Sequence, residues 1–376
     1  MLIWLGLCAV ACFAGGLLLL HLGTLSVLAA AHLVFALGIL PLIFGAISHF
    51  VPVLTRSGPP GRLLRTLPFL LQGVGLLAFL GFAEHPLWLH PAATAGVVLA
   101  CAFAGWLLVR ARRTLGKPHP GWRWYLAAIG VLALALALVP PMLLWPELRH
   151  PLRLAHLHLN TLGFIGLTAI GTLQVLLPTV LSGPDAEAAA RLRRDLPLAL
   201  GGVLAVALGA AFWRPLALLG ALLLLAVCLR LGRAWLHRYG WRTLAGDGAG
   251  AALGVALLGF VLLIDVGVAH AFGVTEGRAA VAAFVLAFLL PLVTGALSQL
   301  LPVWRWPGPR TPVRDAMRAL LVAGGAARAL AFLLAGSLLL AGSDGGYWLA
   351  AAALLHFALA LLRALVSRKR PEPPGG

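Results

Sequence analysis

The sequence is poor in charged residues, and poorest in acidic ones. Only 10% of its 376 residues are charged, with 11 Asp and Glu against 28 Lys and Arg. Soluble domains average about 25% charged residues, so this composition excludes an ordinary soluble domain. Hydrophobic residues make up 61% of the chain instead, and the mean hydropathy is +1.00.

Apolar runs recur along the whole chain, and each approaches the roughly 20 residues that a helix needs to cross a bilayer. The first run begins MLIWLGLCAV and lacks the basic start and cleavage site of a signal peptide. The runs, about twelve in all, lie near 2–21, 25–53, 66–83, 91–111, 124–146, 153–181, 196–213, 215–232, 246–270, 279–303, 316–341 and 346–366. We therefore predict an all-α integral membrane protein with about twelve transmembrane helices, forming a single domain over 1–376.

Cysteine and methionine are also scarce, with four and three residues. No C-x-x-C pair occurs, so a copper relay built from thiols and thioethers has no support. Cys8 and Cys12 share one helix face, and the other two cysteines lie in separate runs. We interpret all four as small apolar packing residues.

The basic residues are distributed unevenly between the connections. Most follow the second, fourth, sixth, eighth and tenth runs or lie in the C-terminal tail. Positive charge near helix ends marks the cytoplasmic side of a membrane, so both termini should be cytoplasmic. The net charge of +17 then reflects topology, with the lipid bilayer as partner and no nucleic acid. The expected location is a bacterial cytoplasmic (inner) membrane.

Three runs share a pattern that repeats along the chain. HLVFALGILPLIFGAISHFVP and HLNTLGFIGLTAIGTLQVLLP each begin with a histidine and end with a proline 20 residues later. In both, and in AFVLAFLLPLVTGALSQLLP, a glycine precedes the final proline by seven residues. These prolines, Pro52, Pro178 and Pro302, lie 126 and 124 residues apart. The spacing predicts three pseudo-symmetric four-helix repeats, at approximately 1–123, 124–242 and 243–376.

Histidines gather at the ends of the runs opposite the basic connections, which places the histidine-rich side outside the cytoplasm. Twenty helical residues rise about 30 Å, so His32 and His158 should lie at equal depth near one face of the hydrocarbon core. Imidazoles that enter a bilayer are candidates for function, and imidazole is an axial ligand of haem iron. We predict that these two residues hold a haem, with Gly45 and Gly171 allowing another backbone or a flat ligand to come close.

Other polar residues fit the same prediction. His156 points about 200° away from His158 on a helix and should address a second pocket. Arg328 lies within the eleventh run and needs an anion there, either Asp265 or a haem propionate. The remaining propionate candidates are Arg153 and Arg278. The alternative interpretation of the histidines is that each is a core residue whose ring bonds a backbone carbonyl.

At this point the sequence resembles a family. Twelve helices in three repeats, with outward histidines on the second and sixth, are similar to subunit I of the haem–copper oxidase superfamily. The ending SHFVP and the histidine–glycine–proline spacing more closely resemble its non-oxidase relatives, the NnrS-type haem and copper membrane proteins. The resemblance implies haem b, and copper as a second metal near His156, His270 or His356. It also implies a role in redox chemistry, nitric oxide response, or haem and copper handling, with an electron donor or small gas ligand as partner.

The departures from that family exclude a dioxygen-reducing centre. The tenth run has Ala282 at the repeat-equivalent position and no histidine, and the three tyrosines all lie near helix ends. If the chain is an enzyme, the resemblance implies a haem-dependent oxidoreductase. Two alternatives stay open: a twelve-helix transporter without haem, and a cofactor-free assembly or scaffold protein. Neither the substrate nor the oligomeric state can be read from the sequence.

Overall fold

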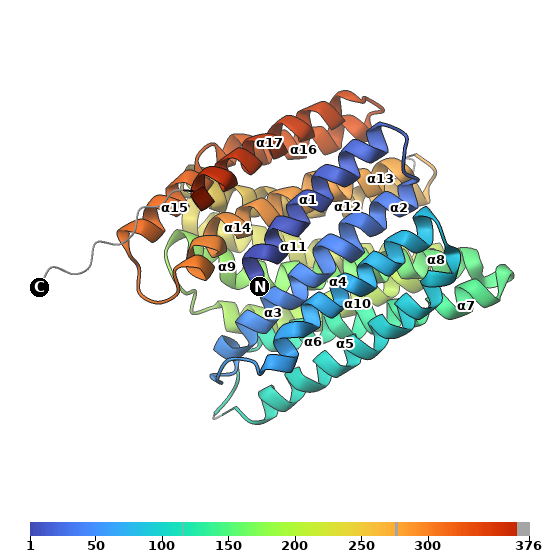
Figure 1. Cartoon of the computed structure of the whole chain (residues 1–376), viewed down its shortest axis with the longest axis horizontal. Helices are drawn as coiled ribbons and strands as arrows, with labels where there is room; N and C mark the ends of the chain where they lie inside the picture. The colour runs from blue at the N-terminus through green and yellow to red at the C-terminus, as the bar shows by residue number, and fades with distance from the viewer. Residues whose placement is uncertain (115, 275–276, 367–376) are drawn as a thin grey trace, which may run out of the picture. The chain divides into compact units, whose positions relative to one another are not determined.

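The computed structural model describes residues 1–114, 116–274 and 277–366, which form helices joined by short connections, with no β-strand among them (Figure 1). Twelve helical spans are long and apolar enough to cross a membrane. The prediction of an all-helical chain with twelve spans, compatible with a polytopic membrane protein, is confirmed. We number these spans 1 to 12 in chain order.

Several spans consist of two to four helical segments in sequence. The α-helices are α1 (Leu2–His21), α2 (Val27–His32), α3 (Leu40–Leu54), α4 (Arg62–Ala83), α5 (Leu89–Arg112), α6 (Gly121–Ala137), α7 (Val139–Leu144), α8 (Arg149–His158), α9 (Thr168–Leu181), α10 (Ala188–Phe212), α11 (Arg214–Gly246), α12 (Gly248–Ala271), α13 (Gly277–Ala283), α14 (Leu290–Arg305), α15 (Pro312–Val322), α16 (Gly325–Leu340) and α17 (Gly345–Val366). Three segments are π-helices, η1 (Leu33–Ile39), η4 (Leu159–Leu167) and η5 (Phe284–Leu289), and two short ones are 3₁₀-helices, η2 (Pro86–Trp88) and η3 (Pro146–Leu148).

Two spans differ from the sequence expectation. Span 8 was expected to end near residue 232, but α11 continues to Gly246, with a break at Gly240, where φ is +70°. Span 11 was expected to be one helix over 316–341, but it is divided into α15 and α16 at Gly324, whose φ is +66°. Only glycine adopts such positive φ angles at little cost, so the chain can change direction at these two points.

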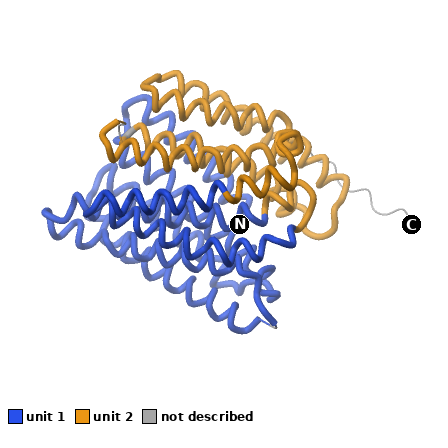
Figure 2. The backbone as a smooth tube through the Cα atoms, turned by 180° about the vertical axis from the view of Figure 1, so that it is seen from behind, with its two compact units in different colours: residues 1–175, 185–229 blue, residues 176–184, 230–376 orange. Residues whose placement is uncertain are grey.

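The chain divides into two compact units (Figure 2). Unit 1 comprises residues 1–175 and 185–229, and unit 2 comprises 176–184 and 230–376. In unit 1, the fully buried Trp124 of α6 donates its indole N–H to the Leu192 carbonyl oxygen of α10 at 2.9 Å. In unit 2, the Phe260 and Phe288 rings pack with their centroids 4.8 Å apart, which joins α12 to η5.

The three π-helical segments lie in spans 2, 6 and 10, the spans that carry the sequence pattern. In spans 2 and 10, the second residue after the π-helix is a proline, at Pro41 and Pro291. A proline lacks an N–H, and its ring clashes with the carbonyl of residue i−4, so the preceding helical turns cannot continue as a regular α-helix. In span 6, Gly163 and Gly166 lie within the π-helical segment, and the Thr168 hydroxyl donates to the Phe164 carbonyl oxygen at 2.7 Å.

Glycines bring a neighbouring helix against two of these segments. A Cβ added at Gly75 of α4 would lie 2.2 Å from the Ala36 carbonyl oxygen in η1. A Cβ added at Gly259 of α12 would lie 2.0 Å from the Ala287 carbonyl oxygen in η5. No larger residue fits at such distances, so each glycine lets two helix backbones touch.

Candidate functional site

His32 is the last residue of α2, immediately before η1. The hydroxyl of Ser26 caps the helix by accepting a hydrogen bond from the Ala29 N–H at 3.1 Å. The His32 Nδ1 lies 2.8 Å from the Leu28 carbonyl oxygen, and its ring packs on Phe82 of α4 with centroids 4.2 Å apart. Because a carbonyl only accepts hydrogen bonds, Nδ1 must carry the proton, and in the neutral ring Nε2 then presents the lone pair.

His158 repeats this local geometry in span 6. It is the last residue of α8, immediately before η4, and its Nδ1 lies 2.8 Å from the Leu154 carbonyl oxygen. Its neutral ring therefore has the same tautomer as His32, with the lone pair on Nε2. Figure 1 shows α2 and α8 at the same end of unit 1.

His156 uses a different partner. Its Nδ1 lies 2.8 Å from the carbonyl oxygen of Ala135, on the neighbouring helix α6. His156 also lies close enough to His32 for the two rings to interact electrostatically. The pairing of His32 with His158 stays a prediction, and His156 becomes a second candidate for the position opposite His32.

These carbonyl contacts also match the alternative in which the histidines are satisfied core residues. The two interpretations are compatible, because metal-binding histidines usually donate their other ring N–H to a carbonyl or carboxylate. That second bond fixes the ring orientation and the tautomer, and Nε2 is the atom that would bind a metal. The geometry of all three histidines therefore fits an axial ligand of haem iron.

The two candidate glycines are sites of close approach by protein side chains. A Cβ at Gly45 would lie 2.7 Å from the Leu5 Cδ1 of α1, and one at Gly171 would lie 2.7 Å from the Trp124 Cβ of α6. The sequence left open whether a backbone or a flat ligand comes close here. In the structure, neighbouring helices fill both positions.

Arg328 lies in α16 and is only 4% exposed. Its guanidinium donates to the Leu321 carbonyl oxygen at 3.0 Å and to the Nδ1 of His356 at 3.2 Å, and it lies over the ring of Phe357. Asp265, one partner expected from the sequence, is an exposed residue of α12, and no carboxylate contacts Arg328 among the described residues. Among the described residues, the Nε of Arg328 has no hydrogen-bond partner.

His356 of α17 thus has a defined role beside this arginine. An arginine only donates hydrogen bonds, so the Nδ1 of His356 accepts and its proton lies on Nε2. His270 is an exposed residue at the end of α12. Among the residues that the structure describes, no group of three or more His, Cys, Asp and Glu side chains is arranged to hold a metal ion. A second metal near His156, His270 or His356 stays a prediction.

The other two propionate candidates lie near span ends. Arg153 is exposed in α8, with one guanidinium nitrogen 3.5 Å from the Nδ1 of His150. Arg278 lies in the first turn of α13, and its side chain is outside the described part of the structure.

Sequence reasoning missed two features of the structure. One is the ion pair between Arg318 of α15 and Asp247, with a nitrogen–oxygen distance of 2.6 Å. Asp247 also caps α12 by accepting from the N–H groups of Ala249 and Gly250, both at 2.9 Å. The sequence signal was present, since an aspartate directly before a glycine-rich apolar run is typical of a helix start. The other feature is the π-helical geometry, which carries no such signal.

Comparison with protein-family models and with curated proteins finds no match for this chain. The family resemblance therefore rests on the spacing of histidine, glycine and proline in spans 2 and 6, together with the twelve-span architecture.

Proposed function

We propose that this chain is a membrane protein that binds haem b at the ends of spans 2 and 6. One observation carries the proposal. His32 and His158 each end an α-helix directly before a π-helix, and each donates Nδ1–H to the carbonyl four residues earlier at 2.8 Å. Two imidazoles with the same tautomer, on spans with the same pattern, are the ligands that a haem with two axial histidines requires. π-Helical turns are also frequent at functional sites.

The three-repeat organisation and the orientation of the chain are part of this proposal. The three π-helices begin at residues 33, 159 and 284, which matches the period predicted from the prolines. The basic connections support cytoplasmic termini in a bacterial inner membrane, with the histidine end on the opposite side.

Bound haem would supply one-electron chemistry or a site for a small gas ligand. The chain's own residues would hold the iron through His32 and through His158 or His156, and fix both rings through their carbonyl bonds. We infer a role in redox chemistry, nitric oxide response, or haem and copper handling. Span 10 has no histidine, so the proposal does not extend to dioxygen reduction.

The transporter alternative has one observation in its favour. Span 11 is broken at Gly324, and the buried Arg328 bonds the carbonyl oxygen of Leu321 near that break. Broken helices with exposed backbone groups line the substrate sites of many secondary transporters. A haem-free protein would favour this alternative or the scaffold.

Absorption spectroscopy of the detergent-purified protein, oxidised and dithionite-reduced, tests the proposal. We expect a Soret band and sharp reduced α and β bands, which His32→Ala abolishes. Loss in His158→Ala assigns the second ligand to His158, and loss in His156→Ala assigns it to His156. The control is His90→Ala, an exposed histidine in the first turn of α5, which should keep the spectrum. Absence of any Soret band after expression with ample haem would overturn the proposal.

A further inference from the structure

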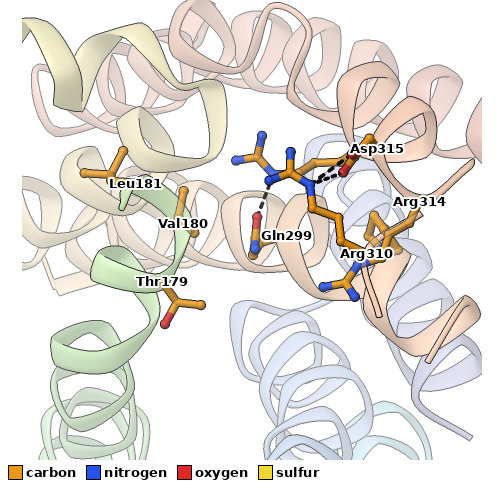
Figure 3. Close-up of a pocket in the computed structure, with 9 residues that line it drawn as sticks. Thr179, Val180, Leu181, Gln299, Arg310, Arg314 and Asp315 are labelled. Atoms are coloured by element: carbon orange, nitrogen blue, oxygen red, sulfur yellow. Dashed lines mark hydrogen bonds and ion pairs between the residues drawn. The ribbon is translucent and has the colours of Figure 1, made fainter. Parts of the chain in front are cut away.

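A cavity of about 380 Å³ lies in unit 2, at the ends of α9 and α14 and beside α15 (Figure 3). Its apolar wall includes Val180, Leu181 and Pro302, and its polar wall is formed largely by α15 and the chain before it. The volume lies at the lower end of the roughly 300–1,000 Å³ typical of small-ligand sites. It therefore suits a compact polar group.

The lining carries more positive than negative charge. Arg310, Arg314 and Arg318 line the cavity together with one carboxylate, that of Asp315. These residues lie in the connection after span 10 and in α15, on the side that the basic loops predict to be cytoplasmic.

The local sequence accounts for the convergence of the arginines. Thr311 caps α15 by accepting from the Arg314 N–H, and Pro312 occupies the first helical position, where a proline is tolerated. Arg314 and Arg318 are four residues apart and so lie on one face of the helix. The buried Met317 and Leu321 hold that helix against the rest of unit 2.

Two of the three arginines are already paired with carboxylates. The Arg310 Nε lies 2.8 and 2.9 Å from the two oxygens of Asp315. Arg318 donates to Asp247 at 2.6 Å and to the Gln299 side-chain oxygen at 2.7 Å. Figure 3 shows the bonds to Asp315 and Gln299 as dashed lines. These partners fix the positions of both side chains at the cavity.

Arg314 is different. Its guanidinium donates to the Gly308 carbonyl oxygen at 3.1 Å, and no carboxylate contacts it among the described residues. The fork of N–H groups on a guanidinium matches the oxygens of a phosphate group. Arg314 is half-buried, and no carboxylate balances its charge. Two arginines with fixed positions lie beside it, and this arrangement favours the binding of an anion.

We propose that this cavity binds a phosphate group, with Arg314 as the main contact and Arg318 and Arg310 as supporting charges. The group belongs either to an anionic phospholipid headgroup or to a soluble phosphate compound. Basic pockets at the cytoplasmic ends of transmembrane helices are known to hold anionic headgroups. The apolar wall beside the arginines suits the glycerol and upper acyl chain of a lipid. This proposal is independent of haem binding.

Native mass spectrometry of the full-length protein in detergent tests the site. The probes are phosphatidylglycerol and phosphatidylcholine with identical acyl chains. For the wild-type protein we expect retention of phosphatidylglycerol at least fivefold above phosphatidylcholine. Arg314→Gln should abolish that preference, whereas Arg363→Gln should keep it, because Arg363 is an exposed arginine of span 12 outside the cavity. Arg314→Lys retains the charge and provides a second variant if Arg314→Gln does not fold; it should weaken the preference.

Inorganic phosphate distinguishes the two sources. If 10 mM phosphate does not displace the phospholipid, the ligand is a lipid headgroup. If phosphate raises the melting temperature of the delipidated wild-type protein but not of Arg314→Gln, the ligand is a soluble phosphate compound. Equal lipid retention by Arg314→Gln and Arg363→Gln, with no thermal shift by phosphate, would overturn the proposal.

Discussion

Spans 2 and 10 share a π-helix, a following proline and a glycine seven residues before a terminal proline, yet their surroundings differ. In η5 of span 10 all six residues are buried, and the Phe284 and Phe288 rings pack with centroids 5.1 Å apart. In η1 of span 2 only Val34, Gly38 and Ile39 of seven residues are buried. The π-helix of the histidine-bearing span is therefore less buried, and the π-helix of the span without a histidine is fully buried.

Span 6 lies between these two cases. The first half of η4 is half-buried from Asn160 to Leu162, and its second half is buried. The open part therefore lies next to His158, as the open part of η1 lies next to His32. All three spans contain a π-helix, but only the two that carry a histidine have half-buried residues in that π-helix.

The largest effect is expected where helix backbones touch these segments. Gly259→Val would force a side chain against the Ala287 carbonyl of the fully buried η5, and should lower the free energy of unfolding by about 3 kcal/mol. Gly75→Val meets the Ala36 carbonyl of the open η1 and should cost less, because η1 can shift. Thermal and denaturant unfolding in detergent measure both.

The matched controls for these two variants are Gly254→Val and Gly73→Val. A Cβ at either position meets nothing within 4 Å. Both should therefore change stability by less than about 1 kcal/mol, since valine forms helix slightly better than glycine. If the controls lose as much stability as Gly259→Val, close backbone contact is not the cause.

The next effect concerns the missing histidine of span 10. In a His158→Ala protein, added imidazole should restore the reduced haem bands, because the first half of η4 is only half-buried. Ala282→His in the same protein should not restore them, because the neighbouring η5 is closed by packed side chains. Absorption spectra of the His158→Ala protein with imidazole and of the protein that carries both substitutions test these two expectations. If Ala282→His restores the bands, burial of η5 is not what prevents a histidine on span 10 from binding haem.

A smaller effect is expected at the start of α2. Ser26→Ala removes the cap of the short helix that carries His32 and should cost about 1 kcal/mol. Hydrogen exchange of residues 27–32 should accelerate, while exchange in α8 stays unchanged. The control is Ser343→Ala, in the turn before α17, where the same change removes no cap hydrogen bond. Equal exchange in the wild-type and Ser26→Ala proteins would show that packing alone holds α2.

The smallest effect concerns a histidine outside the spans. His119 accepts a hydrogen bond from the Gly121 N–H at 3.3 Å, and burial, followed by the nearby Arg193, lowers its pKa below the ordinary 6.5. The unfolded chain therefore binds a proton first as pH falls, so stability is lost below about pH 6.5 and is fully present above it.

His119→Gln should flatten this pH dependence. Melting temperatures at pH 7.5 and 5.5 measure the change, with the exposed His85→Gln as a control that keeps the wild-type slope. An unchanged slope in His119→Gln would assign the pH dependence to other groups.

The sequence predicted the twelve spans because hydropathy and length together determine which segments a bilayer accepts. The first span was placed to the residue, at 2–21, and the last within one residue, at 346–366 against Gly345–Val366. The end of α11 was missed because its last turns carry Arg233, Arg238 and Arg242, which lower hydropathy without ending a helix. The break in span 11 was missed because small residues and glycine are also common inside membrane helices.

Less of the candidate site than of the fold could be predicted from the sequence. The sequence pattern singled out His32 and His158, but it did not indicate that a π-helix follows each of them. Side-chain direction could not be predicted, since the bond of His156 to Ala135 depends on how α8 packs against α6. The partner of Arg328 could not be predicted either, because His356 lies on a different span.

The π-helix in span 2 also has an angular consequence. A π-helical turn accommodates one residue more than an α-helical turn, and one residue corresponds to about 100° of rotation around the axis. The two ends of the span address different neighbours, since His32 packs on Phe82 of α4, whereas Gly45 receives Leu5 of α1. Insertion or deletion of a single residue within Leu33–Ile39 would reorient one end against the other without changing any side chain at either end.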